Sequence, residues 1–311
     1  MTGLSDALRG RDFLSLHDFT PAEVALLLDL AAQLKGDQGA DCHPLRGKAV
    51  ALVFQKPSTR TRISFEVAVG QLGGQPLYLN AADLQLGRGE TVADTARVLS
   101  RYVAAVMIRT FAHAEAEELA RHATVPVING LTDRLHPCQA LADLLTLRER
   151  KGELAGLRLS YVGDGNNVAH SLLFAGAKTG VDVRVAHPPG FAPDPEVLRA
   201  AREDARETGA RLEVGTDPAA AVAGADAVYT DVWTSMGQES EREGRRAAFR
   251  PYQVDAALMS RAKPDAVFLH CLPAHRGEEV AAEVIDGPAS AVFDQAENRL
   301  HAQKALLALL V

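Results

Sequence analysis

The feature that most constrains the fold is a repeated alternation of short apolar runs with longer segments of helical spacing. Runs such as AVALVFQ (49–55) and DAVFLHCL (265–272) are almost entirely apolar and only seven or eight residues long. Strands of this type are buried on both faces, as in a parallel sheet that is covered by helices on each side. The alternation therefore predicts an α/β fold built on parallel sheets.

The expected elements fall into two groups. In the first half we expect strands at 49–55, 104–110 and 125–130, with helices at 20–35, 61–72 and 114–122. In the second half we expect strands at 157–164, 181–188, 225–233 and 265–272, with helices at 168–179 and 195–208. A long helix over 138–151 joins the halves, and residues 297–311 have helical spacing with an apolar face.

The fold class that follows is α/β, with two doubly wound parallel-sheet domains joined by a long helix. We expect the C-terminal helix to pack back on the first domain. The predicted domains are residues 1–150, completed by 297–311, and residues 151–296. A chain of 311 residues agrees with roughly two domains of ~150 residues each.

Composition excludes several classes of protein. The net charge of −7 provides no general attraction for nucleic acid or for an acidic membrane surface, although a locally basic site remains open. Three scattered cysteines do not suit a disulfide framework. The N-terminal residues carry spread charges and no apolar core, unlike a signal peptide, and no apolar run approaches a membrane span. We expect a cytoplasmic protein without nucleic-acid or membrane partners.

The segment PSTRTR (57–62) lies between an expected strand and an expected helix. Free backbone N–H groups and the positive helix end make this position suitable for an anion. Three hydroxyl side chains and the guanidinium groups of Arg60 and Arg62 add donors and charge that fit phosphate. The alternative is an ordinary helix cap, since Ser and Thr are common there. The segment is not a P-loop, because GxxxxGK[ST] is absent.

Three other polar residues stand at the ends of expected elements. Arg109 follows a strand, and His136 and Gln139 in HPCQ open the long helix. In an open α/β sheet this rim is where ligands bind. Taken singly, an arginine here is more often a surface group, and a histidine a capping residue.

The second half contains a segment that resembles part of a dinucleotide fingerprint. GDGNNVAHS (163–171) lacks the third glycine, and the next strand ends in His187-Pro188 where an acidic residue would be expected. A nicotinamide cofactor is therefore not expected. Asn166 and Asn167 instead offer amide groups at a helix N-terminus.

Two strands of the second half end in chemically useful side chains. Asp231 suits an ammonium ion, and Cys271, if ionised, suits a nucleophile or base. A cysteine in an apolar strand is more commonly just packed. His270 beside Cys271 suggests metal binding, but no second ligand pair has a suitable spacing, so no metal is expected.

Together these motifs resemble the carbamoyltransferase family. FQKPSTRTRISFEVA and HPCQAL are similar to its carbamoyl phosphate motifs. SMG in DVWTSMGQE and the sequence HCLPA are similar to the ornithine members. Aspartate members would have an Arg-containing pattern instead, and putrescine members another pair of residues in place of the triplet. The resemblance runs from about Leu14 to ENR near the C-terminus, over at least five ordered motifs.

The resemblance implies roles for particular residues. The carbamoyl phosphate site comprises Ser58, Thr59, Arg60, Thr61, Gln85, Arg109, His136, Pro137, Cys138, Gln139 and Arg299. The ornithine site comprises Asn167, Asp231, Ser235, Met236, Cys271 and Leu272. The catalytic group comprises Arg60, Arg109, His136 and Cys271. Gln85 is expected to reach the site of a neighbouring subunit in a homotrimer or an assembly of trimers.

The implied reaction moves the carbamoyl group of carbamoyl phosphate to the δ-amino group of L-ornithine, giving citrulline and phosphate without a cofactor. Cys271 either positions the amine or accepts its proton. Arginine biosynthesis is the expected setting; citrulline breakdown and a related amine such as putrescine remain alternatives. A nucleotide-dependent dehydrogenase and a binding protein that has lost a reacting group are the rivals from other classes. A dehydrogenase would need the third glycine and the acidic residue that this chain lacks. A binding protein would have lost a reacting group, whereas every motif position is intact here.

Overall fold

The computed structural model describes residues 2–36, 43–85, 89–234, 237 and 239–311. The chain forms two compact units, Met1–Leu145 with Glu297–Val311 and Thr146–Ala296. It passes from one unit to the other within helix α6 (Pro137–Lys151) and again within helix α13 (Val292–Leu310). Within the described residues, no helix is both long enough and apolar enough to cross a membrane.

The first unit is built on a four-stranded parallel sheet with the order β2-β1-β3-β4. Its strands are β1 (Ala49–Phe54), β2 (Gln75–Asn80), β3 (Ala105–Arg109) and β4 (Val127–Leu131). The three predicted strands are confirmed, and β2 is an additional edge strand. Its sequence QPLYLN is largely half-exposed, so it has no apolar run that the sequence analysis could detect.

Five helices of the first unit precede α6: α1 (Thr2–Leu8), α2 (Pro21–Gly36), α3 (Thr59–Gln71), α4 (Val92–Leu99) and α5 (His113–His122). Two short 3₁₀ helices, η1 (Leu16–Asp18) and η2 (Ala81–Asp83), complete the described part of this unit. A capping box begins α2. The Glu23 N–H donates to Thr20 Oγ1 at 3.3 Å, and the Thr20 N–H donates to Glu23 Oε2 at 2.8 Å.

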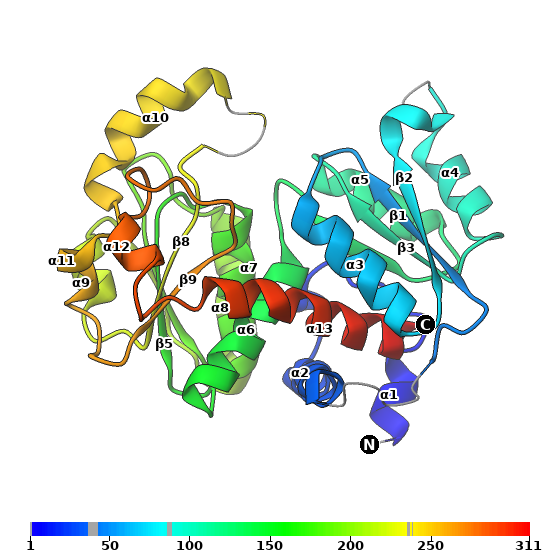
Figure 1. Ribbon diagram of the computed structural model, residues 1–311, viewed down its shortest axis with the longest axis horizontal. Helices are drawn as coiled ribbons and strands as arrows, with labels where there is room; N and C mark the ends of the chain where they lie inside the picture. Colours follow the sequence, from blue (N-terminus) through cyan, green and yellow to red (C-terminus); the bar gives the residue numbers. More distant parts are fainter. Residues whose placement is uncertain (1, 37–42, 86–88, 235–236, 238) are drawn as a thin grey trace. The chain divides into compact units, whose positions relative to one another are not determined.

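The part of α13 from Glu297 onward belongs to the first unit, as the apolar face of residues 297–311 predicted. Lys35 Nζ donates to Asn298 Oδ1 at 2.8 Å, and the Gly10 N–H donates to the Leu310 carbonyl at 2.8 Å. Leu306 and Leu310 are completely buried. Figure 1 shows this helix (red) beside α2 and α3. The C-terminal residues of the chain therefore pack in the same core as its N-terminal helices.

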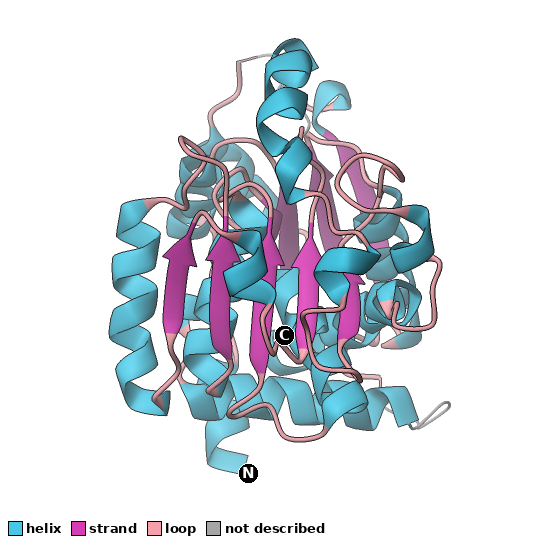
Figure 2. Ribbon diagram, turned by 90° about the vertical axis from the view of Figure 1, so that its left-hand side faces the viewer, coloured by secondary structure: helices cyan, strands magenta, loops and turns pink. Residues whose placement is uncertain are grey.

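The second unit is built on a five-stranded parallel sheet with the order β7-β6-β5-β8-β9. The strands are β5 (Arg158–Val162), β6 (Asp182–Ala186), β7 (Leu212–Gly215), β8 (Ala227–Thr230) and β9 (Val267–His270). Figure 2 shows them running in one direction with helices on both faces. The four predicted strands are confirmed, and the short edge strand β7 is again an addition.

The helices of the second unit are α7 (Asn167–Thr179), α8 (Pro195–Thr208), α9 (Pro218–Val222), α10 (Arg242–Phe249), α11 (Ala256–Met259) and α12 (Ala282–Ile285), with 3₁₀ helices η4 (Glu239–Glu241) and η5 (Arg250–Tyr252). The strand order reverses between β5 and β8, where the chain winds outward in both directions. At such a point the chain segments that follow two adjacent strands turn to opposite faces of the sheet. The space between them, at the carboxyl ends of the strands, can accommodate a ligand.

We predict that Leu306→Ala lowers the free energy of unfolding by about 2–5 kcal/mol, because it leaves a cavity where the side chain is completely buried. Leu309 lies on the same helix and is only partly buried, so Leu309→Ala should cost less. Urea unfolding followed by circular dichroism at one protein concentration measures both. Equal losses in the two variants would contradict the packing of α13 described above.

Candidate active site

The predicted anion segment folds as the N-terminus of α3, directly after β1. Ser58 is the N-cap, and its Oγ accepts the N–H of Thr61 at 3.1 Å. The ordinary capping interpretation is therefore correct for this oxygen, although the hydroxyl proton can still be donated to a ligand. Thr59 and Arg60 follow in the first helical turn, where the helix end carries partial positive charge.

The two arginines of this segment have different surroundings. Arg62 Nε donates to Glu66 Oε1 at 3.0 Å, and its guanidinium lies 3.7 Å from the ring centroid of Tyr78. Arg60 is half-buried and acts electrostatically on His136. Arg60 is therefore the arginine that belongs to the candidate site, whereas Arg62 belongs to the surface of α3.

Two further arginines converge on Thr61. Arg109 Nη1 donates to Thr61 Oγ1 at 3.4 Å, and Arg299 Nη2 donates to the same oxygen at 3.1 Å. Both arginines are buried, and they come from β3 and α13. Their common acceptor is a hydroxyl in the first turn of α3, where the helix end also carries partial positive charge. Planar guanidinium groups suit the oxygens of a phosphate, so the arrangement fits a bound anion of this kind.

Arg109 is placed by an irregularity in the sheet. The register between β3 and β4 shifts at this residue, so that Ile108 pairs with Asn129 and Arg109 pairs with Leu131. Such bulges re-aim a side chain at the edge of a sheet. Gly130 is the residue that this register shift passes over. A side chain there would collide with Met107, so glycine at this position allows the two strands to fit tightly.

His136 precedes α6 and is buried. Burial, followed by the charges of Arg299, Arg109 and Arg60, holds the pKa of His136 well below its ordinary value. The imidazole is therefore neutral near neutral pH. A neutral imidazole donates one N–H and accepts at the other nitrogen, so it can donate to a carbonyl oxygen without carrying charge.

The first turn of α6 supplies Pro137, Cys138 and Gln139, all buried. Gln139 Oε1 accepts from Arg299 Nη1 at 2.7 Å, and its Nε2 donates to Asp143 Oδ1 at 2.8 Å, which fixes the amide orientation. Cys138 is committed elsewhere. Its Sγ donates to the Asn129 carbonyl at 3.3 Å, and burial raises the pKa of the thiol to about 12. Any contact of Cys138 with a ligand must use its backbone.

Lys56 is a further buried cation beside this segment, and its sequence context does not reveal its burial. Lys56 Nζ forms an ion pair with Asp133 and lies 4.2 Å from the ring centroid of Phe111. Its charge is therefore compensated by a carboxylate. Gln85, by contrast, has an exposed side chain after η2, and its carbonyl accepts the N–H of Glu90 at 3.0 Å.

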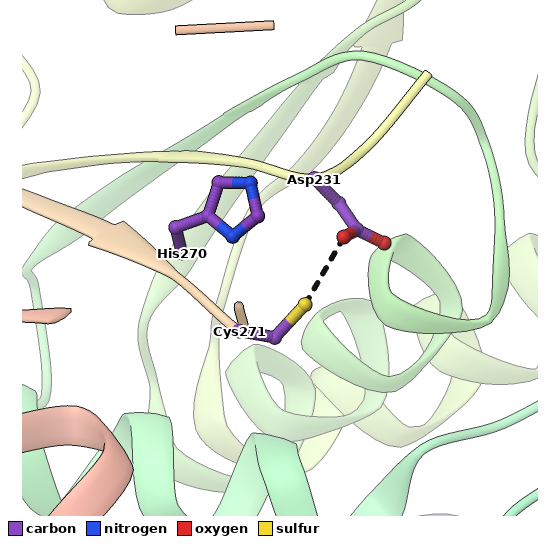
Figure 3. Close-up of side chains that lie close together, drawn as sticks. All are labelled: Asp231, His270 and Cys271. Carbon is purple, nitrogen blue, oxygen red and sulfur yellow. Dashed lines mark hydrogen bonds between the residues drawn. The ribbon is translucent and has the colours of Figure 1, made fainter. Parts of the chain in front are cut away.

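In the second unit, the pairing of β8 with β9 brings Asp231 and Cys271 together (Figure 3). Thr230 and His270 are partners in the sheet, so the next residue of each strand leaves the same edge. Cys271 Sγ donates to Asp231 Oδ1 at 3.1 Å. In this geometry the proton is on sulfur, which favours a thiol over the thiolate considered from sequence.

Asp231 is the centre of this cluster. Its Oδ1 also accepts the N–H of Val232 at 2.8 Å, and its Oδ2 accepts from Asn166 Nδ2 at 2.8 Å. A carboxylate has about four acceptor positions, so an ammonium group can still be accommodated. The Asn166 contact spans the point between β5 and β8 where the strand order reverses.

Asn166 has a structural role that the sequence analysis did not assign. As the N-cap of α7 it accepts the N–H groups of Val168 at 2.9 Å and Ala169 at 3.2 Å through Oδ1. The same side chain therefore holds the helix and Asp231. Asn167, the predicted substrate residue, is the half-buried first residue of α7. The predicted residues Ser235 and Met236 lie outside the described residues.

Leu272 follows Cys271 in an unusual backbone conformation. Its φ is 57°, a left-handed value that costs a residue with a side chain about 1–3 kcal/mol. The Leu272 N–H donates to His270 Nδ1 at 2.8 Å. The buried His270 Nε2 lies 3.1 Å from Glu279 Oε1, so both ring nitrogens are engaged.

This geometry bears on metal binding. Asp231, His270 and Cys271 have potential ligand atoms within 4.8 Å of one another, a grouping that sequence spacing could not show. Figure 3 shows the three side chains together. Because the imidazole is already committed to Leu272 and Glu279, the cluster suits an amine better than a metal ion.

Comparisons with known proteins match each half of the chain. Residues 11–149 match the family described as aspartate/ornithine carbamoyltransferase, carbamoyl-P binding domain, and residues 155–310 match its Asp/Orn binding domain. The ornithine carbamoyltransferase of Symbiobacterium thermophilum is 61% identical over 308 residues, which cover 98% of this chain and 99% of that protein.

Two relatives come from Pyrococcus furiosus. Its anabolic ornithine carbamoyltransferase is 59% identical over 307 residues, covering 98% of each chain. A solved structure of ornithine carbamoyltransferase from this organism matches with a TM-score of 0.95 and 60% identity over 97% of each chain. The chain therefore belongs to the aspartate/ornithine carbamoyltransferase family.

Proposed function

We propose that the chain is an ornithine carbamoyltransferase, which transfers the carbamoyl group of carbamoyl phosphate to the δ-amino group of L-ornithine. The convergence of buried Arg109 and Arg299 on Thr61, at the N-terminus of α3, is the observation that carries this function. It forms a site for a phosphate-bearing substrate. Asp231 and Cys271 form a separate cluster suited to an amine.

On the phosphate side, the charges have two roles. Arg109, Arg299 and the first turn of α3 bind the phosphate oxygens. They do so both in bound carbamoyl phosphate and in the phosphate product that leaves. Arg60 and neutral His136 donate to the carbonyl oxygen, where negative charge develops during attack. Because these donors are already held in place, little reorganisation is needed at that step. The proposed site also includes Ser58, Thr59, Thr61, Gln85, Pro137, Cys138 and Gln139.

On the amine side, the substrate must lose a proton before it can attack, since a free alkylamine has a pKa near ~10.4. The nitrogen–carbon bond forms and the bond from carbon to the phosphate oxygen breaks. The phosphate dianion that leaves can accept the proton, so no dedicated base is required. We assign Asp231 and Cys271 to orienting the amine, with Leu272 beside them. The remaining proposed contacts are Asn167, Ser235 and Met236.

The setting that we propose is arginine biosynthesis in the cytoplasm. The name of the Pyrococcus furiosus relative, an anabolic ornithine carbamoyltransferase, supports the direction of the reaction. The alternatives are a catabolic enzyme of the same chemistry and an enzyme for a related amine such as putrescine. The chemistry described above uses no metal or organic cofactor.

The acceptor assignment is tested by measuring citrulline and related ureido products with carbamoyl phosphate and three amines. L-Ornithine should have the highest kcat/KM, with putrescine and L-aspartate far lower, because the expected contacts include the α-amino acid group. If putrescine matches ornithine, the chain is a carbamoyltransferase with a different acceptor.

Arg60 and Arg62 provide a matched pair for testing the phosphate side. Arg60→Ala should lower kcat/KM for carbamoyl phosphate by about 10- to 150-fold, equivalent to the ~1.5–3 kcal/mol of a charge-assisted hydrogen bond. Arg62→Ala removes an exposed contact to Glu66 and should stay within about threefold of the parent. Steady-state kinetics of both variants give the comparison. Equal effects would remove Arg60 from its proposed role.

We also propose a homotrimer, or an assembly of trimers, in which Gln85 reaches the site of a neighbouring subunit. The side chain of Gln85 is exposed in its own chain. The same unit exposes apolar side chains of Ile63 and Val67 on α3 and Tyr78 on the edge strand β2, at 53%, 38% and 36% exposure. Apolar surface of this kind is suited to contact with another copy of the chain.

Complementation tests the shared site. One variant defective at Gln85 and another defective at Cys271, each nearly inactive alone, are dissociated, mixed equally and reassembled. Random assembly should restore about a quarter of the sites, because each restored site needs an intact core from one chain and an intact loop from the next. If native mass spectrometry shows mixed oligomers and activity stays absent, each chain forms its own site.

A further inference from the structure

Arg245, on α10 of the second unit, is buried although its sequence context is polar. It is 5% exposed, whereas its neighbour Arg246 is exposed. Its guanidinium lies 4.8 Å from the ring centroid of Phe191 and 5.1 Å from that of Phe249. Burying a guanidinium among rings is costly unless its donors meet acceptors, so its contacts indicate why it is there.

Arg245 Nη1 lies 3.7 Å from Glu241 Oε2 of η4, and the other two donor groups reach two different loops. Its Nε donates to the Trp233 carbonyl at 2.6 Å, and its Nη2 forms an ion pair with Asp164. Asp164 follows β5, and Trp233 follows β8. Burial raises the pKa of Asp164, and the adjacent Arg245 charge opposes that rise. One planar group therefore ties together the loops that leave the two strands at the reversal of strand order.

These loops carry Asp231 of the proposed amine site and Asn166, which holds Asp231 and precedes the proposed contact Asn167. Asn166 stands two residues after Asp164, and Asp231 stands two residues before Trp233. Asn166 Nδ2 and Asp231 Oδ2 are themselves 2.8 Å apart. The Asn166–Asp231 contact and the Asp164–Arg245–Trp233 bridge thus hold the same pair of loops at two places. A shift of either loop would move Asp231 relative to Asn167.

Arg245 also closes a loop in the chain. The segment 234–244 begins after Trp233, whose carbonyl Arg245 binds, and ends at Arg245 itself. The SMG triplet lies in the sequence of this segment. Trp233 and Arg245 are 12 positions apart in the sequence, and this contact joins them.

We infer that Arg245 is a positioning residue for the amino-acid substrate, acting by bridging Asp164 and the Trp233 carbonyl. The inference rests on the proposed function for the identity of that substrate. Arginine suits this role because Nε and Nη2 of one rigid plane reach two acceptors in fixed directions. A lysine has a single ammonium on a flexible chain and cannot reproduce both contacts in the same geometry.

The test compares Arg245→Lys with Arg246→Lys, which makes the same change at the exposed neighbour. For Arg245→Lys we expect KM for L-ornithine to rise about tenfold or more, from the lost charge-assisted contact, with KM for carbamoyl phosphate within about twofold. Arg246→Lys should leave both constants unchanged. A role in stability alone would reduce the active fraction and leave both KM values where they were, which would overturn the inference.

Trp233 provides a second readout, because it is the single tryptophan of the chain and its side chain is buried. Release of its carbonyl should shift the tryptophan emission of Arg245→Lys to longer wavelength, with far-ultraviolet circular dichroism unchanged. Arg246→Lys should keep the emission of the parent. An unchanged spectrum together with unchanged KM values would overturn the bridge.

Asp164→Asn addresses the other side of the bridge and is the milder change if Arg245→Lys folds poorly. It removes the charge and keeps an acceptor oxygen, so KM for ornithine should rise in the same direction. The double variant should raise KM by less than the product of the single effects, because both remove one interaction. Independent effects would contradict a shared bridge.

The assay of the wild type with the three amines distinguishes a failure of this inference from a failure of the proposed function. If the wild type prefers another amine, the ornithine assignment fails, and the same KM comparison is made with the preferred amine. The bridge is then supported if KM for that amine rises in Arg245→Lys, and it is wrong if KM does not change.

Discussion

Parallel pairing of neighbouring strands is the constraint on which the site depends. In each sheet it sends the carboxyl ends of adjacent strands to one edge, so residues far apart in sequence become neighbours. Asp231 and Cys271 are 40 positions apart, yet the pairing of β8 with β9 places them in hydrogen-bonding contact. The same geometry in the first unit brings the end of β3 beside the start of α3.

Buried positive charge is the second constraint, and it acts on the proposed phosphate site of the first unit. Arg109 and Arg299 share Thr61 as an acceptor, and burial together with the charges of nearby arginines holds the pKa of His136 well below its ordinary value. In the proposed reaction the two arginines bind the phosphate, and Arg60 and His136 donate to the carbonyl oxygen as it gains charge. The second unit differs, because its buried arginine, Arg245, is compensated by Asp164 and serves the backbone.

Much of the fold follows from local pattern. The apolar runs identified seven of the strands, because a strand buried on both faces has to be apolar throughout. The edge strands β2 and β7 were missed, since an edge strand is half-exposed and its sequence looks like a loop. Helix α10 was missed because REGRRAAF is mostly polar, and its two buried residues, Arg245 and Phe249, are covered only through tertiary contacts.

The sequence by itself determined the two α/β halves, the residue types of the candidate site and the resemblance that links them to a reaction. The resemblance already selected Arg60 over Arg62, but only the tertiary structure supplied the physical reason, which is that the two arginines have different neighbours. The tertiary structure also decided that Cys138 is packed while Cys271 faces a carboxylate, and that Arg245 is buried beside an exposed Arg246. The physical reason is that charge compensation and burial depend on neighbours contributed by distant segments, which local spacing does not encode.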